Sequence, residues 1–243
     1  MTSADTAAGA KTICLAPNVK DLAPPRAHRR NCGVNENPLG TSELKVSELA
    51  FGCWAVAGGA NWGDQDDRDS VEAVQTALDV GMTFFDTAEA YGPYHSEEIL
   101  GKALGTRRRE ILLVTKVGFT FDDQNNIVGR NSDPVYITER VEGCLKRLGT
   151  DVIDLLLIHW PDHETPYADA IGALERLKEA GNIRTYGVSN YTVPMMEQCE
   201  KAGHLTANQV GYHMYDRRME SEVLPYCQEH KVGFMAYGTL GFG

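Results

Sequence analysis

The sequence predicts an α/β fold, a (β/α)8 TIM barrel that is incomplete: seven of the eight strands are present, with an N-terminal hairpin at the floor. From about residue 46 one pattern recurs: an apolar strand, a loop, and an amphipathic helix closed by glycine. Several of the strands are apolar on both faces, as buried parallel strands must be. No G-x-G-x-x-G motif follows the first strand, which argues against a doubly wound dinucleotide-binding domain.

The expected strands follow one another along the chain, each separated from the next by a helix or a loop. We place them at residues 49–54, 83–88, 111–117, 152–160, 184–190, 206–212 and 232–238. Residues 38–52, which precede and include the first strand, alternate like a hairpin and are expected to cap the barrel floor.

Helix ends carry clear signals in four of the intervening segments. Asp69 or Ser70 is the expected N-cap of the first helix, and Gly81 lies just past its end. The helix that starts near residue 137 ends before Gly149 in the same way, and a third runs from 167 to a glycine at 181. In the segment 193–203, Pro194 stands where a first-turn proline is tolerated.

Composition limits the classes of partner. A formal net charge of −11 argues against a nucleic-acid surface or an anionic membrane as partner, and no apolar stretch is long enough to span a bilayer. Six scattered cysteines form no C-x-x-C pair, which favours reduced thiols and a cytoplasmic location. Residues 1–36 are expected to be a disordered extension, with an organelle transit peptide as the alternative, and residues 37–243 to be the barrel domain.

Ionisable and polar residues stand at the carboxyl ends of the expected strands, where barrel enzymes place their catalytic groups. In chain order these residues are Asp86, Lys116, His159, Ser189, Asn190, Gln209 and Tyr237, with Tyr91 in the loop after Asp86. Each has an ordinary structural interpretation, as a helix cap, a rim charge or a buried core histidine. A whole set of polar groups leaving apolar strands is harder to explain in that way, because each is costly to bury unpaired.

A proton-relay site is one chemistry that fits this set. Tyr91 would be a general acid, and the Lys116 cation beside it would lower its pKa from the ordinary value of about 10. Asp86 would hold the lysine through an ion pair, and His159 would orient or polarise a carbonyl oxygen. Such a site reduces an aldehyde or a ketone by hydride from a bound cofactor.

Two other chemistries use part of the same set. Lys116 could be a Schiff-base nucleophile, as in barrel aldolases, although this leaves Tyr91 without a role. A hydrolytic metal site could use Asp86 and His159 with the neighbouring Asp162 and His163. The metal interpretation is weaker, because the two histidines stand four apart across a strand end and a proline, and no H-x-H pair occurs.

Five segments of the sequence resemble the signature segments of the aldo-keto reductase superfamily, in order and at the family's spacing. They are DTAEAYG, VTKVG, LLLIHWPD, GVSNY and the glutamine of NQVGY. The resemblance runs from about residue 38 to the last residue. Within the superfamily, segments such as FGCWAVAGGANWG and ERLKEAGNIRTYGVSN are most similar to the bacterial-type, stress- and sugar-linked branch.

The resemblance implies roles for individual residues. The catalytic tetrad falls on Asp86, Tyr91, Lys116 and His159, and no metal is implied. Ser189, Asn190 and Gln209 would hydrogen-bond the nicotinamide carboxamide, on whose ring Tyr237 would stack. The full set of implied cofactor-binding residues is Gly52, Trp54, Asp86, Ser189, Asn190, Gln209, Tyr237, Gly238 and Leu240.

In the family, an eighth strand and further helices follow the seventh strand, so the resemblance also implies a C-terminally truncated chain. The residues that bind the phosphate on the adenosine ribose would then be missing. The usual cofactor of the family is NADPH, and NADH is left open as the alternative. The expected substrate is a small aldehyde, ketone or sugar. Open edges on the first and seventh strands would promote self-association. Two alternatives to an active reductase are an inactive truncated product and a non-catalytic, cofactor-sensing subunit.

Overall fold

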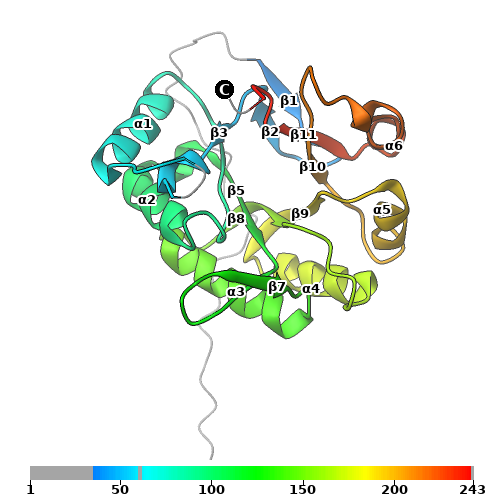
Figure 1. Cartoon of the computed structure of the whole chain (residues 1–243). Helices are drawn as coiled ribbons and strands as arrows, with labels where there is room; N and C mark the ends of the chain where they lie inside the picture. Colours follow the sequence, from blue (N-terminus) through cyan, green and yellow to red (C-terminus); the bar gives the residue numbers. More distant parts are fainter. Residues whose placement is uncertain (1–34, 60–61, 242–243) are drawn as a thin grey trace, which may run out of the picture.

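The structure, a computed structural model, describes residues 35–59 and 62–241. Its centre is a sheet of seven parallel strands in the order β11-β10-β9-β8-β5-β4-β3 (Figure 1). All seven predicted strands are confirmed, and each lies beside its predecessor along the chain. Their bounds are Phe51–Gly52 (β3), Phe84–Asp86 (β4), Leu112–Val117 (β5), Ile153–Ile158 (β8), Ile183–Ser189 (β9), Ala207–Gly211 (β10) and Gly233–Tyr237 (β11). This sheet is an incomplete (β/α)8 barrel.

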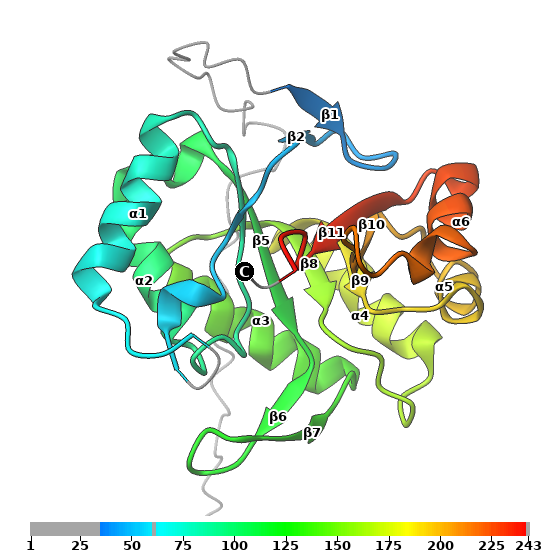
Figure 2. The same cartoon turned by 45° about the horizontal axis from the view of Figure 1, so that its top comes forward.

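Helices cover the outer face of the sheet (Figures 1 and 2). They are Asp67–Asp79 (α1), His95–Leu104 (α2), Pro134–Leu148 (α3), Tyr167–Glu179 (α4), Val193–Cys199 (α5) and Val223–His230 (α6), with short 3-10 turns at Ala55–Ala57, Gly105–Glu110 and Arg218–Glu220. Within the described residues, no helix has the length and apolar character needed to cross a membrane. The expected self-association through the sheet edges and the cytoplasmic location stay predictions.

The helix ends follow the sequence signals with one correction. Gly149 closes α3 in the left-handed conformation, at φ 61°, and Pro194 lies in the first turn of α5, both as predicted. The N-cap of α1, however, is Asp66 and not Asp69 or Ser70: the Asp66 backbone is extended and its carboxylate accepts from the Arg68 N–H at 2.8 Å. The Ser70 hydroxyl is used elsewhere, since it donates to the Val56 carbonyl at 2.8 Å.

The predicted floor hairpin is present. Strands Glu36–Pro38 (β1) and Lys45–Ser47 (β2) pair antiparallel, and β1 begins one residue before the predicted domain start. Of the predicted extension, residues 1–34 lie outside the described residues. The turn of the hairpin packs against the sheet: Gly40 has φ 56°, and a Cβ there would lie 2.3 Å from the Thr206 carbonyl oxygen. The hairpin closes the end of the barrel at which the strands begin (Figure 2).

The inward face of the strands changes from apolar to polar along their length. Alternate residues of a strand point to the same face of the sheet. In β5, Leu112 and Val114 belong to a buried apolar cluster. The cluster also contains Leu39 and Leu44 of the floor hairpin and apolar side chains from β4, β8, β10 and β11. The next residue on that face of β5 is Lys116. The same step of two residues separates Phe84 from Asp86, Leu157 from His159, Ala207 from Gln209 and Met235 from Tyr237.

A second hairpin was not predicted from the sequence. Strands Phe119–Phe121 (β6) and Ile127–Arg130 (β7) pair antiparallel between β5 and α3, and they project at the carboxyl end of β5 (Figure 2). The signal was present in FTFDDQNNIVGR, two short alternating runs around a polar turn in which Asn125 adopts a left-handed φ of 63°.

Candidate active site

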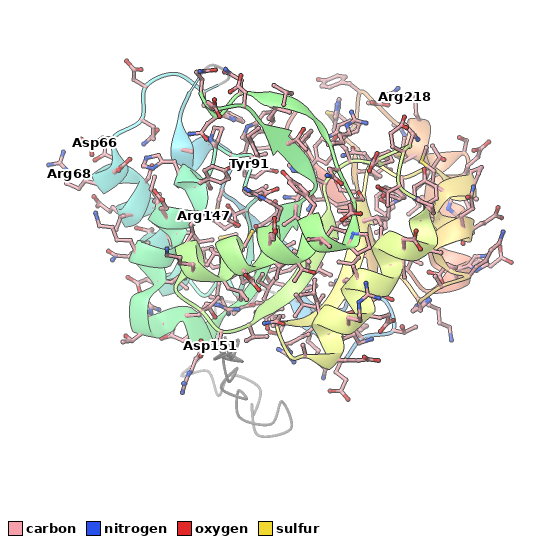
Figure 3. The ribbon with its side chains drawn as sticks, turned by 90° about the horizontal axis from the view of Figure 1, so that it is seen from below. Asp66, Arg68, Tyr91, Arg147, Asp151 and Arg218 are labelled. Atoms are coloured by element: carbon pink, nitrogen blue, oxygen red, sulfur yellow. The ribbon has the colours of Figure 1, made fainter. Side chains whose placement is uncertain are left out.

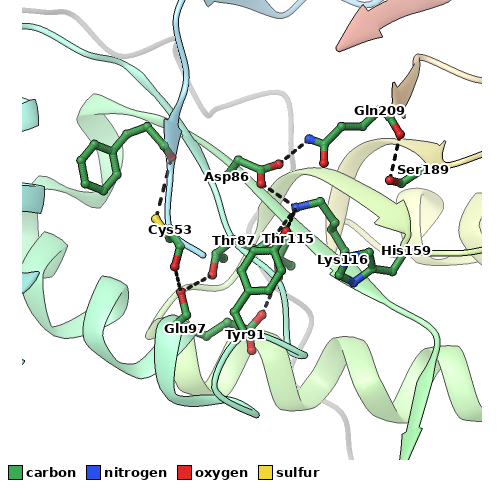
Figure 4. A network of polar contacts seen from close by, with 12 residues as sticks. Cys53, Asp86, Thr87, Tyr91, Glu97, Thr115, Lys116, His159, Ser189 and Gln209 are labelled. Atoms are coloured by element: carbon green, nitrogen blue, oxygen red, sulfur yellow. Dashed lines mark hydrogen bonds and ion pairs between the residues drawn. The ribbon is translucent and has the colours of Figure 1, made fainter. Parts of the chain in front are cut away.

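Lys116 lies at the centre of the polar set at the carboxyl ends of the strands. Its side chain is completely buried, and its ammonium donates to the Asp86 carboxylate at 2.5 Å, to the Thr87 carbonyl at 2.9 Å and to the Tyr91 hydroxyl at 3.1 Å (Figure 4). Three oxygens therefore use the three donors of the ammonium. Asp86, Tyr91 and Lys116, expected together from the sequence, do lie together.

The charges of this group depend on burial as well as on its neighbours. Burial by itself would lower the pKa of Lys116, but the Asp86 carboxylate and the Tyr91 hydroxyl outweigh it, so that the pKa lies above its ordinary value. The ammonium is thus charged. For Tyr91 the prediction of a lowered pKa is wrong in its net direction: burial raises the pKa of the phenol, and the opposing effect of Lys116 only partly offsets this.

His159 follows β8 and faces the Tyr91 ring. Its backbone N–H donates to the Val117 carbonyl at 2.9 Å, which fixes the end of β8 beside the end of β5. The imidazole meets the Tyr91 ring edge-on, with ring centroids 5.7 Å apart. Its Nδ1 is buried and has no hydrogen-bond partner among the residues that the structure describes. Burial first, and then the Lys116 cation, hold the pKa of His159 well below its ordinary 6.5. The imidazole is therefore neutral at physiological pH.

The loop that carries Tyr91 is fixed by a second buried ion pair. The Glu89 side chain is fully buried; it accepts from Arg140 of α3 at 2.7 Å and from the Gly118 N–H, just after β5, at 3.3 Å. This joins the Tyr91 loop to the strand that carries Lys116. Figure 3 shows Tyr91 within the body of the fold, while Arg68 at the start of α1 extends from its edge with 83% of its side chain exposed.

The predicted cofactor-binding side chains form a connected network on β9, β10 and β11. Asn190 links it: its amide donates to the His159 carbonyl at 3.1 Å and to the Ser189 hydroxyl at 3.0 Å, and it accepts from the Tyr237 hydroxyl at 2.9 Å. The Ser189 hydroxyl donates to the Gln209 carbonyl at 2.9 Å. Gln209 also joins the catalytic set directly, because its side-chain amide donates to the second Asp86 oxygen at 2.7 Å (Figure 4).

The remaining predicted residues lie at or after the ends of β3 and β11. The Trp54 ring stacks on Tyr91 with centroids 6.0 Å apart, and a Cβ placed on Gly52 would meet nothing within 4 Å, so the end of β3 faces open space. After β11, Gly238 adopts φ 65° and accepts from the Gly241 N–H at 2.8 Å, while Leu240 is exposed. The cofactor roles of these residues stay predictions.

The two competing chemistries fit this geometry less well. A lysine nucleophile must be neutral to attack a carbonyl, whereas the Lys116 ammonium is charged and all three of its donors are used. In the proposed metal set, Asp162 points to other partners: its carboxylate accepts from the Ser132 N–H at 2.8 Å and from the Thr165 hydroxyl at 2.7 Å. Across residues 35–59 and 62–241, no three His, Cys, Asp or Glu side chains are grouped as metal ligands would be.

Sequence reasoning missed the residues that support and flank the site. The Glu89 to Arg140 pair carries no motif signal beyond an acidic residue in a loop and a basic one on a helix, 51 positions apart. The β6–β7 hairpin places Phe119 against His159, with ring centroids 4.9 Å apart. An alternating pattern with a turn between β5 and α3 could have indicated this hairpin.

Comparisons with known proteins identify the family of the chain. Residues 48–243 match the model of the aldo/keto reductase family. The chain is 40% identical over 199 residues to the aldo-keto reductase YhdN of Bacillus subtilis, covering 81% of this chain and 59% of that protein. It is 33% identical over 219 residues to the NADH-specific methylglyoxal reductase of Escherichia coli, covering 85% of this chain and 67% of that protein.

Solved structures show the same fold. The holo form of aldo-keto reductase AKR11C1 from Bacillus halodurans superposes with a TM-score of 0.80 at 34% identity, over 86% of this chain and 68% of that one. The aldo/keto reductase of Klebsiella pneumoniae in complex with NADP and acetate gives a TM-score of 0.72 at 30% identity, over 84% and 68%. The chain thus spans about three fifths to two thirds of the length of these relatives.

Proposed function

We propose that this chain, which belongs to the aldo/keto reductase family, reduces aldehyde or ketone groups to alcohols by hydride transfer from a nicotinamide cofactor. The observation that carries the proposal is the Lys116 ammonium, which bridges the Asp86 carboxylate and the Tyr91 hydroxyl beside the neutral His159 ring. NADPH is the proposed cofactor with NADH as its alternative, since the Klebsiella relative holds NADP and the Escherichia coli relative is named NADH-specific.

In this proposal Tyr91 is the proton donor. When its proton leaves for the carbonyl oxygen of the substrate, negative charge develops on the phenol oxygen, 3.1 Å from the Lys116 nitrogen. A buried cation at that distance stabilises the charge far more than water would. Asp86 keeps the lysine in place and charged. A free tyrosine is a poor acid near neutral pH, and burial weakens it further, so the cation is essential to the step.

His159 would orient the substrate without adding charge. Its depressed pKa keeps the imidazole neutral, so that one ring nitrogen donates a hydrogen bond and the other accepts one. The Trp54 and Phe119 rings lie beside Tyr91 and His159 respectively and limit the access of water. Exclusion of water strengthens each electrostatic contact within the site.

The described residues fit a nicotinamide cofactor, which supplies the hydride when bound. Ser189, Asn190 and Gln209 present hydroxyl and amide groups at adjacent strand ends, and these groups match the donors and acceptors of a carboxamide. Tyr237 offers a half-buried ring that already packs on the Gly211 backbone and is anchored through its hydroxyl. At the other edge of the sheet, a Cβ placed on Gly52 would meet nothing within 4 Å, so a side chain does not fill the space at the end of β3.

Substitution of Tyr91 by phenylalanine tests the proposal. The Tyr91→Phe variant keeps the ring and loses the proton donor, so we expect its rate of NADPH-dependent reduction of 4-nitrobenzaldehyde to fall by about a hundred- to ten-thousandfold. The matched control is Tyr226→Phe, at a tyrosine on α6 that stacks on His230 away from the site. NADPH absorbance at 340 nm gives the rates. Equal rates in the wild type and Tyr91→Phe would contradict the mechanism.

A further inference from the structure

The β6–β7 hairpin brings an arginine to the flank of His159. Phe119 of β6 and Arg130 of β7 are directly opposite each other in the hairpin, so their side chains lie on the same face. The Phe119 ring packs on the His159 imidazole from that face. Strand β7, which carries Arg130, projects at the carboxyl end of β5 (Figure 2), and Arg130 itself lies over the ring of Trp160, the residue after His159.

The Arg130 guanidinium is held in place but is largely free to bind a ligand. It lies over the Trp160 ring, 5.0 Å from the centroid, and one of its nitrogens donates to the Pro161 carbonyl at 3.1 Å. An arginine has five N–H donors, so this single bond leaves most of them available. The Arg130 side chain is exposed to solvent, and the two residues that it contacts, Trp160 and Pro161, directly follow His159 in the chain.

In the part of the chain that the structure describes, no carboxylate neutralises Arg130. Arg140 and Arg147 differ from it, because each binds a buried glutamate at 2.7 Å. Asp162 is near Arg130 in sequence, but both its oxygens accept from other groups: Oδ2 from the Ser132 N–H and the Thr165 hydroxyl, and Oδ1 from the Glu164 N–H at 3.0 Å.

The two other basic side chains near this position, Lys116 and His159, do not offer a free positive charge, so a ligand would meet the charge of Arg130. Lys116 is fully buried and its three donors are used by Asp86, Thr87 and Tyr91. His159 is neutral, and Arg130 contributes to the depression of its pKa. The chain has a formal net charge of −11, so a guanidinium with no carboxylate partner among the described residues is a distinctive feature of the site.

From this arrangement we infer that Arg130 binds the acid group of the substrate, and that the site takes carbonyl compounds bearing a carboxylate on the side remote from the reacting carbon. The inference rests on the proposed carbonyl reduction and adds its substrate class. A guanidinium presents parallel N–H donors that match the two oxygens of a carboxylate, and its packing on Trp160 reduces the entropy lost when it binds. Arg130 is then a specificity-determining residue that leaves the proton relay to Tyr91.

A pair of aldehydes of similar shape tests the inference. We expect kcat/KM for 4-carboxybenzaldehyde to exceed that for its neutral ester, methyl 4-formylbenzoate, by about tenfold in the wild type, the worth of one hydrogen-bonded charge pair. In Arg130→Met this ratio should fall to about one, and Arg130→Lys should restore part of it. The matched control, Arg176→Met, removes an exposed arginine from the last turn of α4, at the opposite end of the barrel, and should keep the wild-type ratio.

Calorimetric titration with 4-carboxybenzaldehyde gives a second readout that needs no turnover. Binding to the wild type that weakens about tenfold in Arg130→Met supports the inference even if neither aldehyde is reduced, in which case only the proposed function fails. An unchanged selectivity ratio in Arg130→Met, equal binding by the two proteins, or no binding by the wild type would overturn it. Circular dichroism spectra of the variants confirm that the comparison is between folded proteins.

Discussion

The two ends of the barrel interior differ in composition although the same strands build both. Where the strands begin, ten apolar side chains form one buried cluster, to which the β1–β2 hairpin contributes Leu39, Leu44 and Val46. Where the strands end, the inward positions carry Lys116, His159 and other polar groups. In Figure 3, Asp151, just before β8, lies at the lower edge of the molecule, away from Tyr91.

The physical reason lies in what each end must bury. Apolar side chains need only to be packed, and the hairpin excludes water from them. A buried charge needs a partner, and Lys116 finds three oxygens while Glu89 finds Arg140. Apolar packing at the floor thus stabilises the fold. The charged side chains at the other end are held in pairs, and the apolar layer below them excludes water from that side.

The strongest test of the separation between the stabilising end and the chemical end is to remove the Lys116 cation. In Lys116→Met nothing stabilises the charge that develops on Tyr91, so we expect kcat for 4-nitrobenzaldehyde to fall by about a thousandfold. Lys178→Met, at a partly exposed lysine on α4, is the control and should retain the wild-type rate. Stopped-flow or steady-state absorbance gives the rates. A loss of less than about tenfold in Lys116→Met would mean that the ammonium does not assist the step.

Shortening a floor residue should give the converse result. Leu44→Ala leaves a cavity in the apolar cluster, and we expect the free energy of unfolding to fall by about 2–4 kcal/mol. Rates per folded molecule should stay at the wild-type level. Leu49→Ala, at a leucine in the following segment that is 67% exposed, should change the unfolding free energy by less than about 0.5 kcal/mol.

Urea denaturation measures both floor variants, and an assay below the unfolding temperature gives the rates. If Leu44→Ala abolished activity while the protein stayed folded, the two ends would be coupled, and the separation of stability from chemistry would be wrong.

The smallest expected effect concerns pH and the neutral His159. Because the pKa of His159 in the folded chain is well below 6.5, the unfolded chain binds a proton below about pH 6.5 that the folded chain does not. Stability from this residue is complete above that pH and is lost as the pH falls, by up to about 1.4 kcal/mol per pH unit. Unfolding free energies at pH 5.5 and 7.5 should differ less in His159→Asn than in the wild type.

His163→Asn, in which an exposed histidine close in sequence is replaced, controls for the loss of any histidine. An identical pH dependence in the wild type and in His159→Asn would show that the imidazole is protonated as readily in the folded chain as in the unfolded one.

The periodicity of the sequence was enough to predict much of the fold. Alternation and apolar runs depend on local residue order, so all seven strands and their order along the chain were predictable. The polar residues at the ends of six of the seven strands were visible for the same reason. The start of α1 was placed too late, because both Asp66 and Asp69 are good caps and only the observed backbone conformation selects Asp66.

What the sequence by itself determined is the order of the elements and the residue types that meet at the carboxyl end of the sheet. The tertiary structure decided which groups contact one another: that Gln209 donates to Asp86, and that Arg130 lies near His159 with no carboxylate partner among residues 35–59 and 62–241. It also decided the sign of the Tyr91 pKa shift, because desolvation depends on everything packed around the phenol. Local order in the chain encodes periodicity, whereas burial and pairing are properties of segments that are distant in sequence and come together only in the fold.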